Sequence, residues 1–360
     1  MNRDLRSNRF DSVDARDSSK SAGAVLTAPN FAETLDYFSS LGFRVEEIFP
    51  ADSPRRATLI GFGCRLFLEE GPRCSSTVRI RSNDAEIHRV VAPNGTIVEF
   101  LPDEVGFDRP ALQSSLVVTP SSDGWHQGRA GMFYRDLVPG RQGNCVIASH
   151  IRIPTGGPVP DYVHFHEVGF QLIFCHRGWV EVVYEGQGEP FVLEAGDCVI
   201  QPPRIRHRVL RSSDEMHVVE IGYPAEHVTK ADPTTTLPSS DLPSDHEWSG
   251  QRFIRFRSAQ AKWSTDGQVE IADTGVASAT SAAADVHVVR GMSSARWATS
   301  STPIDCFRMI FVLEGRVTID IDGHRIDAEE STTLTIPVGR AADLEFTRDS
   351  RLLVVDVVTN

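Results

Sequence analysis

The chain has 360 residues, of which 40% are hydrophobic and 24% charged, as in a soluble globular protein of two or three domains. Its net charge of −13 argues against nucleic acid or an anionic membrane as a partner. No apolar run approaches the ~20 residues of a membrane-spanning helix, and the N-terminus has no secretory signal. The six cysteines show no paired spacing, so we expect reduced thiols in a cytoplasmic protein.

The first part of the chain predicts a small α+β module. Residues 1–22 have no apolar core and predict a disordered tail. Residues 23–103 then predict a strand, a helix with one apolar face that ends at Gly42, and several short strands. The turn signal Pro93-Asn94-Gly95 precedes the last of these strands.

This order, with YFSSLGF early and APNGTIVEF late, resembles one module of the glyoxalase/vicinal-oxygen-chelate family over residues 24–101. In that family a metal ligand lies in the first strand of a module and a glutamate ligand in the last. Glu99 matches the second ligand, but residues 24–27 offer neither His nor Glu. We therefore interpret the module as a packing element. Its open sheet edge needs a partner, which is either the same module of a second chain, giving a homodimer, or the barrels of its own chain.

The rest of the chain predicts two β-barrels joined by linkers. Residues 104–130 and 233–250 have the composition of linkers. Residues 131–232 hold strand-length segments separated by turn residues, which is typical of an antiparallel barrel or jelly roll. Residues 251–360 repeat this pattern, since FVLEGRVTIDIDG echoes the earlier FCHRGWVEVVYEG. The predicted fold class is mainly β, with two barrels behind the α+β module.

The first barrel contains a cluster of potential metal ligands. His164 and His166 alternate, so on an extended strand their side chains point to the same face. Gln171 follows, and a second signal runs from Gly196 through Pro202 to His207.

These residues resemble the two metal-binding motifs of the cupin superfamily. The resemblance implies a jelly-roll barrel and one divalent metal ion per chain, with iron, manganese, zinc and nickel as the alternatives and His164, His166, Gln171 and His207 as ligands. The sequence departs from the motif where Gln171 replaces a carboxylate ligand and Arg204 replaces a glycine. The opening glycine, Gly157, is also one place early.

The second barrel lacks these ligands. When the repeat is aligned, the four ligand positions fall on Ser301, Pro303, Arg308 and Ala342. We therefore expect a metal-free barrel that covers sheet edges and packs on the first barrel.

The ligand set leaves three functions open. A neutral Gln171 adds no negative charge, so the metal would be a stronger Lewis acid and favour isomerisation, cyclisation or elimination. Dioxygenases are among the commonest cupin enzymes, so the first hypothesis is a metal-dependent dioxygenase of a small oxygen-rich substrate. The third hypothesis is a non-catalytic small-molecule sensor.

Four further residues are candidate catalytic groups. Tyr162 precedes the histidine pair and would donate a hydrogen bond to substrate at the barrel mouth. His150 and Arg152 share one strand face. If that face is inward, Arg152 would hold a carboxylate and His150 would move a proton; an outward pair on a solvated face is the alternative. Glu220 is a candidate base.

Overall fold

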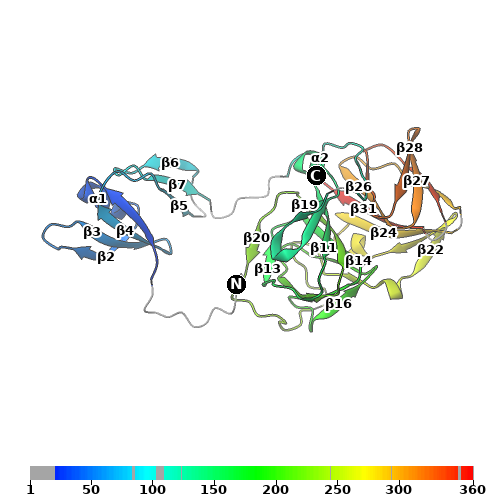
Figure 1. The fold of residues 1–360 in the computed structure, drawn as a ribbon, viewed down its shortest axis with the longest axis horizontal. Coiled ribbons are helices and arrows are strands. Elements are labelled where there is room, and N and C mark those ends of the chain that lie inside the picture. The colour runs from blue at the N-terminus through cyan, green and yellow to red at the C-terminus, as the bar shows by residue number, and fades with distance from the viewer. Residues whose placement is uncertain are drawn as a thin grey trace, which may run out of the picture. The chain divides into compact units, whose positions relative to one another are not determined.

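The structure is a computed structural model that describes residues 21–82, 86–102, 109–122, 124–243, 245–292, 294–347 and 350–359. The chain divides into two compact units, Met1–Gly106 and Phe107–Asn360 (Figure 1). Most of the predicted tail lies outside the described residues. None of the helices in the described ranges is long and apolar enough to cross a membrane. The predicted mainly β fold class is confirmed.

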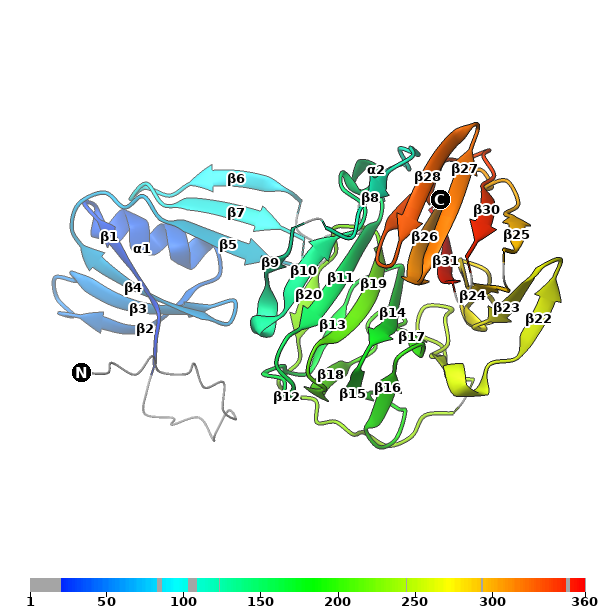
Figure 2. The ribbon, with the colours of Figure 1, turned by 45° about the vertical axis from the view of Figure 1, so that its right-hand side comes forward.

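The first unit is built on one helix and two small sheets. Its elements are β1 (Ala24–Ala28), α1 (Phe31–Ser40), β2 (Arg44–Phe49), β3 (Arg56–Gly61), β4 (Cys64–Glu70), β5 (Thr77–Arg81), β6 (His88–Val91) and β7 (Ile97–Leu101). The sheets have the orders β1-β4-β3-β2 and β5-β7-β6 (Figure 2). Asn30 caps α1 by accepting a hydrogen bond from the Glu33 amide, and Phe31 and Phe38 bury its apolar face.

Glu99, which matches a metal ligand of the glyoxalase/vicinal-oxygen-chelate family, forms an ion pair instead. Arg79 donates to the Glu99 carboxylate at 2.8 Å. This hydrogen bond lowers the pKa of Glu99. The side chain therefore has an ordinary role as a partly exposed strand glutamate.

Deleting the first unit is expected to leave metal binding intact and to abolish dimerisation. No sheet in the described residues contains strands of both units. Strand β2 is an edge strand that is exposed along its length, with Val45, Ile48 and Phe49 open to solvent. Such an edge invites pairing with a second copy. Light scattering and metal analysis of a chain that begins at Phe107 test this; a dimeric fragment, or one without metal, would contradict it.

The second unit begins with a barrel of two sheets. Its strands are β9 (His126–Gln127), β10 (Phe133–Asp136), β11 (Ile147–Ile153), β12 (Gly157–Pro158), β13 (His164–His166), β14 (Phe170–Arg177), β15 (Trp179–Tyr184), β16 (Phe191–Glu194), β17 (Cys198–Ile200), β18 (His207–Ser212), β19 (Met216–Tyr223), β20 (Thr229–Ala231) and β21 (Arg255–Phe256). One sheet runs β21-β17-β14-β19-β11-β10-β9. The other runs β16-β15-β18-β13-β20, with β12 beside β18. Short helices η1 (Arg129–Gly131) and α2 (Arg141–Asn144) flank β10.

A second barrel follows. Its strands are β8 (Val118–Thr119), β22 (Trp263–Asp266), β23 (Val269–Asp273), β24 (Ala284–Gly291), β25 (Arg296–Ala298), β26 (Cys306–Glu314), β27 (Arg316–Ile321), β28 (His324–Glu329), β29 (Thr333–Ile336), β30 (Asp343–Phe346) and β31 (Ser350–Val358). The sheets run β22-β23-β24-β31-β26-β29-β8 and β25-β30-β27-β28, with η2 (Ser258–Gln260) and α3 (Val276–Ala279) between strands.

The internal repeat appears directly in the strand turns. Gly178 joins β14 to β15, and Gly315 joins β26 to β27. Both have a positive φ, 68° and 76°, which glycine adopts without strain. The repeat recognised in the sequence therefore corresponds to equivalent hairpins of the two barrels.

Each of two short strands lies at a sheet edge of one barrel, outside the chain segment predicted for that barrel. Strand β8, which precedes the first barrel, pairs with β29 of the second. Strand β21, which follows the first barrel, pairs with its strand β17. Both short strands close an edge that would otherwise be open. Strand β8 also shows that part of the segment interpreted as a linker is ordered sheet.

The largest core cluster lies between the barrels. It joins Leu172 and Phe174 of β14 to Met309 and Phe311 of β26. Separate clusters fill the interiors of the first and second barrels. Because strand side chains alternate, the sheet that contains β11, β14 and β19 has one face inside its barrel and one face against the second barrel.

Candidate metal centre

Three histidines meet inside the first barrel. His164 on β13 lies directly opposite His207 on β18, and His166 follows two residues later on the same strand. The ring centroids of His164 and His207 are 4.3 Å apart, and those of His166 and His207 are 5.2 Å apart. One ring nitrogen from each residue lies within 4.8 Å of the others. The strand register thus brings together the histidines that the sequence motif predicted as ligands.

The far sides of these rings are hydrogen bonded. Nδ1 of His164 lies 2.7 Å from the Tyr162 carbonyl, and Nδ1 of His207 lies 3.0 Å from the Ile205 carbonyl. A carbonyl only accepts, so each Nδ1 carries the proton and each Nε2 keeps its lone pair. Nδ1 of His166 lies 2.8 Å from the Thr229 hydroxyl. Such contacts orient histidines that bind metals.

Burial keeps the three imidazoles neutral. Desolvation, with repulsion from neighbouring histidines, lowers the pKa of His166 to about 2 and that of His207 well below its usual value. Desolvation also lowers the pKa of His164, as does nearby Arg129. The site therefore offers neutral nitrogen donors at physiological pH.

Gln171 adds an oxygen donor. It precedes the cavity-lining Ile173 by two residues on β14, so its side chain shares the inner face. Its amide NH2 donates to Glu220 Oε1 at 2.5 Å. Its Oε1 is buried and has no hydrogen-bond partner among the described residues. A buried oxygen without a partner is costly, and a cation would satisfy it. Together with three neutral nitrogens, this oxygen fits a divalent metal.

The site opens into a small apolar cavity of about 80 Å³. Its walls are mostly aliphatic, and its polar lining includes Arg129, Tyr134 and Glu220. Desolvation, then the nearby Glu220 charge, raise the pKa of Tyr134, so its phenol stays protonated. This volume holds on the order of five water-sized groups. Any ligand must therefore be small.

Arg129 lies at the edge of the three histidines. Its Nη2 is 3.1 Å from Nε2 of His164. Its Nη1 donates to the buried carboxylate of Asp161 at 3.2 Å. Asp161 also accepts from the Val209 amide, which fixes this anchor to β18. The guanidinium thus reaches the face of the site where the histidine lone pairs converge.

Residues 149–222, which contain all four predicted ligands, match the family model of the cupin domain. This segment is a cupin domain. No curated protein matches this chain in sequence.

Solved structures share the fold of the cupin domain and its repeat. Salicylate 1,2-dioxygenase from Pseudaminobacter salicylatoxidans is 13% identical with a TM-score of 0.52, covering 71% of this chain and 88% of that one. A variant of oxalate decarboxylase from Bacillus subtilis is 10% identical with a TM-score of 0.50, over 69% and 78%. The protein Ylba from E. coli is 8% identical with a TM-score of 0.50, over 70% and 95%. At these identities the likeness concerns the fold.

Two of the predicted catalytic residues lie away from the cupin cavity. In β11, Ile151 and Ile153 line the cavity, so His150 and Arg152 point outward. Arg152 forms a two-pronged ion pair with the exposed Glu215. Of the two orientations that the sequence left open, the structure has the outward one, and the roles that depended on an inward orientation fall away.

The other two lie near the cavity. Glu220 lines it. The side chain of Tyr162 is 45% exposed, and its ring lies 5.9 Å from the Arg129 guanidinium carbon, so it sits outside the cavity beside Arg129. Sequence reasoning missed Arg129 and its anchor Asp161, since Arg129 falls in the segment interpreted as a linker.

In the second barrel, an ion pair takes the place of Gln171. Arg308 stands at the equivalent position and binds the Asp356 carboxylate through Nε and Nη2, at 2.7 and 2.6 Å. Its Nη1 also donates to the Ser300 carbonyl. A cation there opposes metal binding at the repeated position. Among the described residues of this barrel, Asp273, Asp285 and His287 form another group of potential ligands. It is partly exposed, and His287 already pairs with Asp285.

Proposed function

We propose that the chain is a metal-dependent cupin enzyme that acts on a small organic acid, by dioxygenase-type chemistry. The observation that carries this proposal is the convergence of three neutral histidines, with the buried oxygen of Gln171 left without a hydrogen-bond partner among the described residues. His164, His166, His207 and Gln171 would hold one divalent ion. Such an ion polarises bound oxygen groups and, when it is redox-active, supports oxygen chemistry.

Arg129 supplies the reason for an acidic substrate. A guanidinium beside a divalent cation is repelled by it unless an anion lies between them. A carboxylate suits this place, because it accepts paired hydrogen bonds from arginine. Two of the proteins with similar folds are named for salicylate and oxalate, which are carboxylates. In this proposal Asp161 holds the guanidinium in place, and Tyr134 donates a hydrogen bond from the cavity wall.

Redox-neutral chemistry is the second candidate, and Gln171 favours it. An amide ligand leaves the cation with its full charge, which strengthens a Lewis acid. The carboxylate of Glu220 lies 2.5 Å from the Gln171 amide nitrogen and offsets part of the charge of the cation. We therefore rank oxygen chemistry first.

The test is turnover of a panel of small hydroxy acids and dicarboxylic acids by protein loaded with Fe²⁺, Mn²⁺, Zn²⁺ or Ni²⁺. Oxygen uptake equal to substrate loss supports a dioxygenase. Conversion under argon without oxygen uptake supports an isomerase or lyase. Binding of acids without conversion by any metal form would overturn the enzyme proposal and leave a sensor.

Replacing Arg129 with methionine is expected to raise KM for the carboxylate substrate about 30-fold, equivalent to ~2 kcal/mol, because a hydrogen bond to a charged group is lost. Metal content should stay the same, since Arg129 is not a ligand. Arg129→Lys keeps the charge but not the planar fork, so its KM should lie between the two. Equal KM values for all three proteins, or equal use of a neutral amide analogue by the wild type, would contradict the assignment.

A further inference from the structure

A second histidine cluster lies on the outer face of the first barrel, where it meets the second barrel. His150, His176 and His217 come from β11, β14 and β19, which are neighbours in one sheet. Their side chains alternate with the residues that line the cavity, so they point away from it. Phe311 of the second barrel packs edge-on against the rings of His150 and His176.

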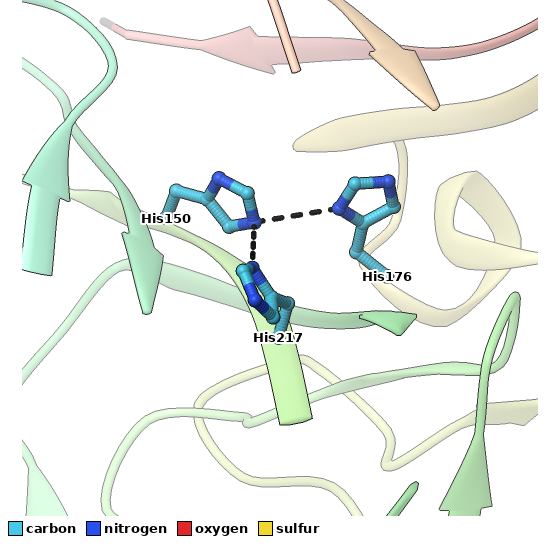
Figure 3. Close-up of side chains that lie close together, drawn as sticks. All are labelled: His150, His176 and His217. Carbon is cyan, nitrogen blue, oxygen red and sulfur yellow. Dashed lines mark hydrogen bonds between the residues drawn. The ribbon is translucent and has the colours of Figure 1, made fainter. Parts of the chain in front are cut away.

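The nitrogens of this cluster converge. Nε2 of His150 lies 3.0 Å from Nδ1 of His217 and 3.3 Å from Nδ1 of His176 (Figure 3). All three nitrogens lie within 4.8 Å of one another. Nitrogens bound to one tetrahedral zinc ion at 2.0–2.1 Å are themselves about 3.3 Å apart. The two short separations match that geometry.

The outer sides of two rings are arranged as metal-binding histidines require. Nε2 of His176 donates to the Leu313 carbonyl at 2.9 Å, so its Nδ1 lone pair faces the cluster. Glu330 lies 3.7 Å from the same Nε2, and Glu215 lies 4.0 Å from Nε2 of His217. Both carboxylates also pair with arginines, Glu330 with Arg177 and Glu215 with Arg152, so they would offset only part of the charge of a bound cation.

Arg135 opposes binding in the metal-free protein. Its Nη2 lies 3.1 Å from Nδ1 of His150, which places the His150 proton on Nε2, between two lone pairs. That single proton cannot satisfy both neighbours well. Metal binding requires this proton to move to Nδ1 of His150. It also requires Arg135 to turn toward the carbonyls of Pro120 and Ser331, to which it already donates at 2.7 Å. Arg129 likewise contacts Nε2 of His164 in the cavity, so metal binding at either site must displace a guanidinium from a histidine nitrogen.

Burial keeps these imidazoles neutral. Desolvation, followed by repulsion from His176 and Arg135, lowers the pKa of His150 to about 2. Desolvation and the His176 charge lower that of His217 to about 4, and desolvation lowers that of His176.

We propose that His150, His176 and His217 form a second metal site, for zinc or another late first-row dication, that ties together three strands at the contact between the barrels. This second site is independent of the proposed function. It raises the expected number of metal ions per chain from one, as the sequence predicted, to two. Imidazole donors suit these ions.

Equilibrium dialysis of the chelator-treated full-length protein against Zn²⁺ tests the proposal. His176→Gln removes the Nδ1 ligand, and its amide can still donate to the Leu313 carbonyl. We expect two equivalents for the wild type, one for His176→Gln, one for His166→Ala and none for the double variant. His324→Gln, on the exposed strand β28, is the matched control and should keep two.

The outcomes separate the two sites. One equivalent in the wild type that disappears in His166→Ala would overturn the second site and leave the cavity site standing. Loss of zinc in His176→Gln without any loss in His166→Ala would support the second site and overturn the cavity site. Cobalt spectra of His166→Ala test the second site with its three histidines intact. The strong visible bands of tetrahedral Co²⁺ are expected, and their absence would contradict the proposal.

Discussion

Replacing His207 with alanine is expected to remove one equivalent of metal per chain and to lower turnover at least about 100-fold. His207 is buried, and its Nε2 is one of three converging imidazole donors. Alanine offers no donor, and loss of even an indirect contact to a ligand costs ~10–100-fold in metal affinity. Metal analysis and steady-state kinetics measure the two effects.

His227→Ala is the matched control. The His227 ring lies 5.6 Å from that of His166, but its Nδ1 is bonded to the Pro224 carbonyl and it is not part of the converging group. We expect full metal content for this variant. If His227→Ala loses the metal and His207→Ala retains it, the ligand assignment is wrong.

Exchanging the two side chains of the Gln171–Glu220 pair is expected to separate the two proposed chemistries. Gln171→Glu alone would place two carboxylates about 2.5 Å apart, and one of them would take up a proton. Gln171→Glu combined with Glu220→Gln keeps the hydrogen bond and moves the negative charge onto the ligand. For a Lewis-acid enzyme, turnover should fall about tenfold or more, equivalent to ~1.4 kcal/mol in the barrier.

For a dioxygenase, the same exchange should leave turnover unchanged or raise it, because a negative ligand makes the metal easier to oxidise. The single variant Glu220→Gln controls for loss of the carboxylate, since its amide oxygen still accepts from Gln171. Initial rates with and without oxygen, together with metal content, decide the case. Unchanged metal affinity and unchanged rate in the double variant would mean that Gln171 is not a ligand.

The parts of the site that the sequence predicted are local in the chain or fixed by strand period. His164 and His166 are two residues apart, so any extended strand places them on one face. The alternation in β14 likewise placed Gln171 and Ile173 on the same side. The repeated glycines at 178 and 315 predicted the duplication because each marks a turn that requires a positive φ.

The parts that were missed depend on contacts between distant segments. Arg129 precedes its anchor Asp161 by 32 residues and lies in a stretch whose composition is typical of a linker. Whether His150 points inward or outward could not be decided from β11 alone. Both faces of that strand are buried, one in the cavity and one against the second barrel. His150, His176 and His217 have no characteristic spacing, and only the sheet order β14-β19-β11 brings them together.

Anomalous diffraction from crystals of metal-loaded protein tests the central claim most directly. We predict a peak in the first barrel about 2.0–2.2 Å from Nε2 of His164, His166 and His207, with Gln171 Oε1 as the oxygen ligand. The second barrel should show no peak near Arg308, where the ion pair with Asp356 occupies the equivalent position. A first barrel whose interior shows no anomalous peak, or an interior peak that none of these three histidines contacts, would contradict the account.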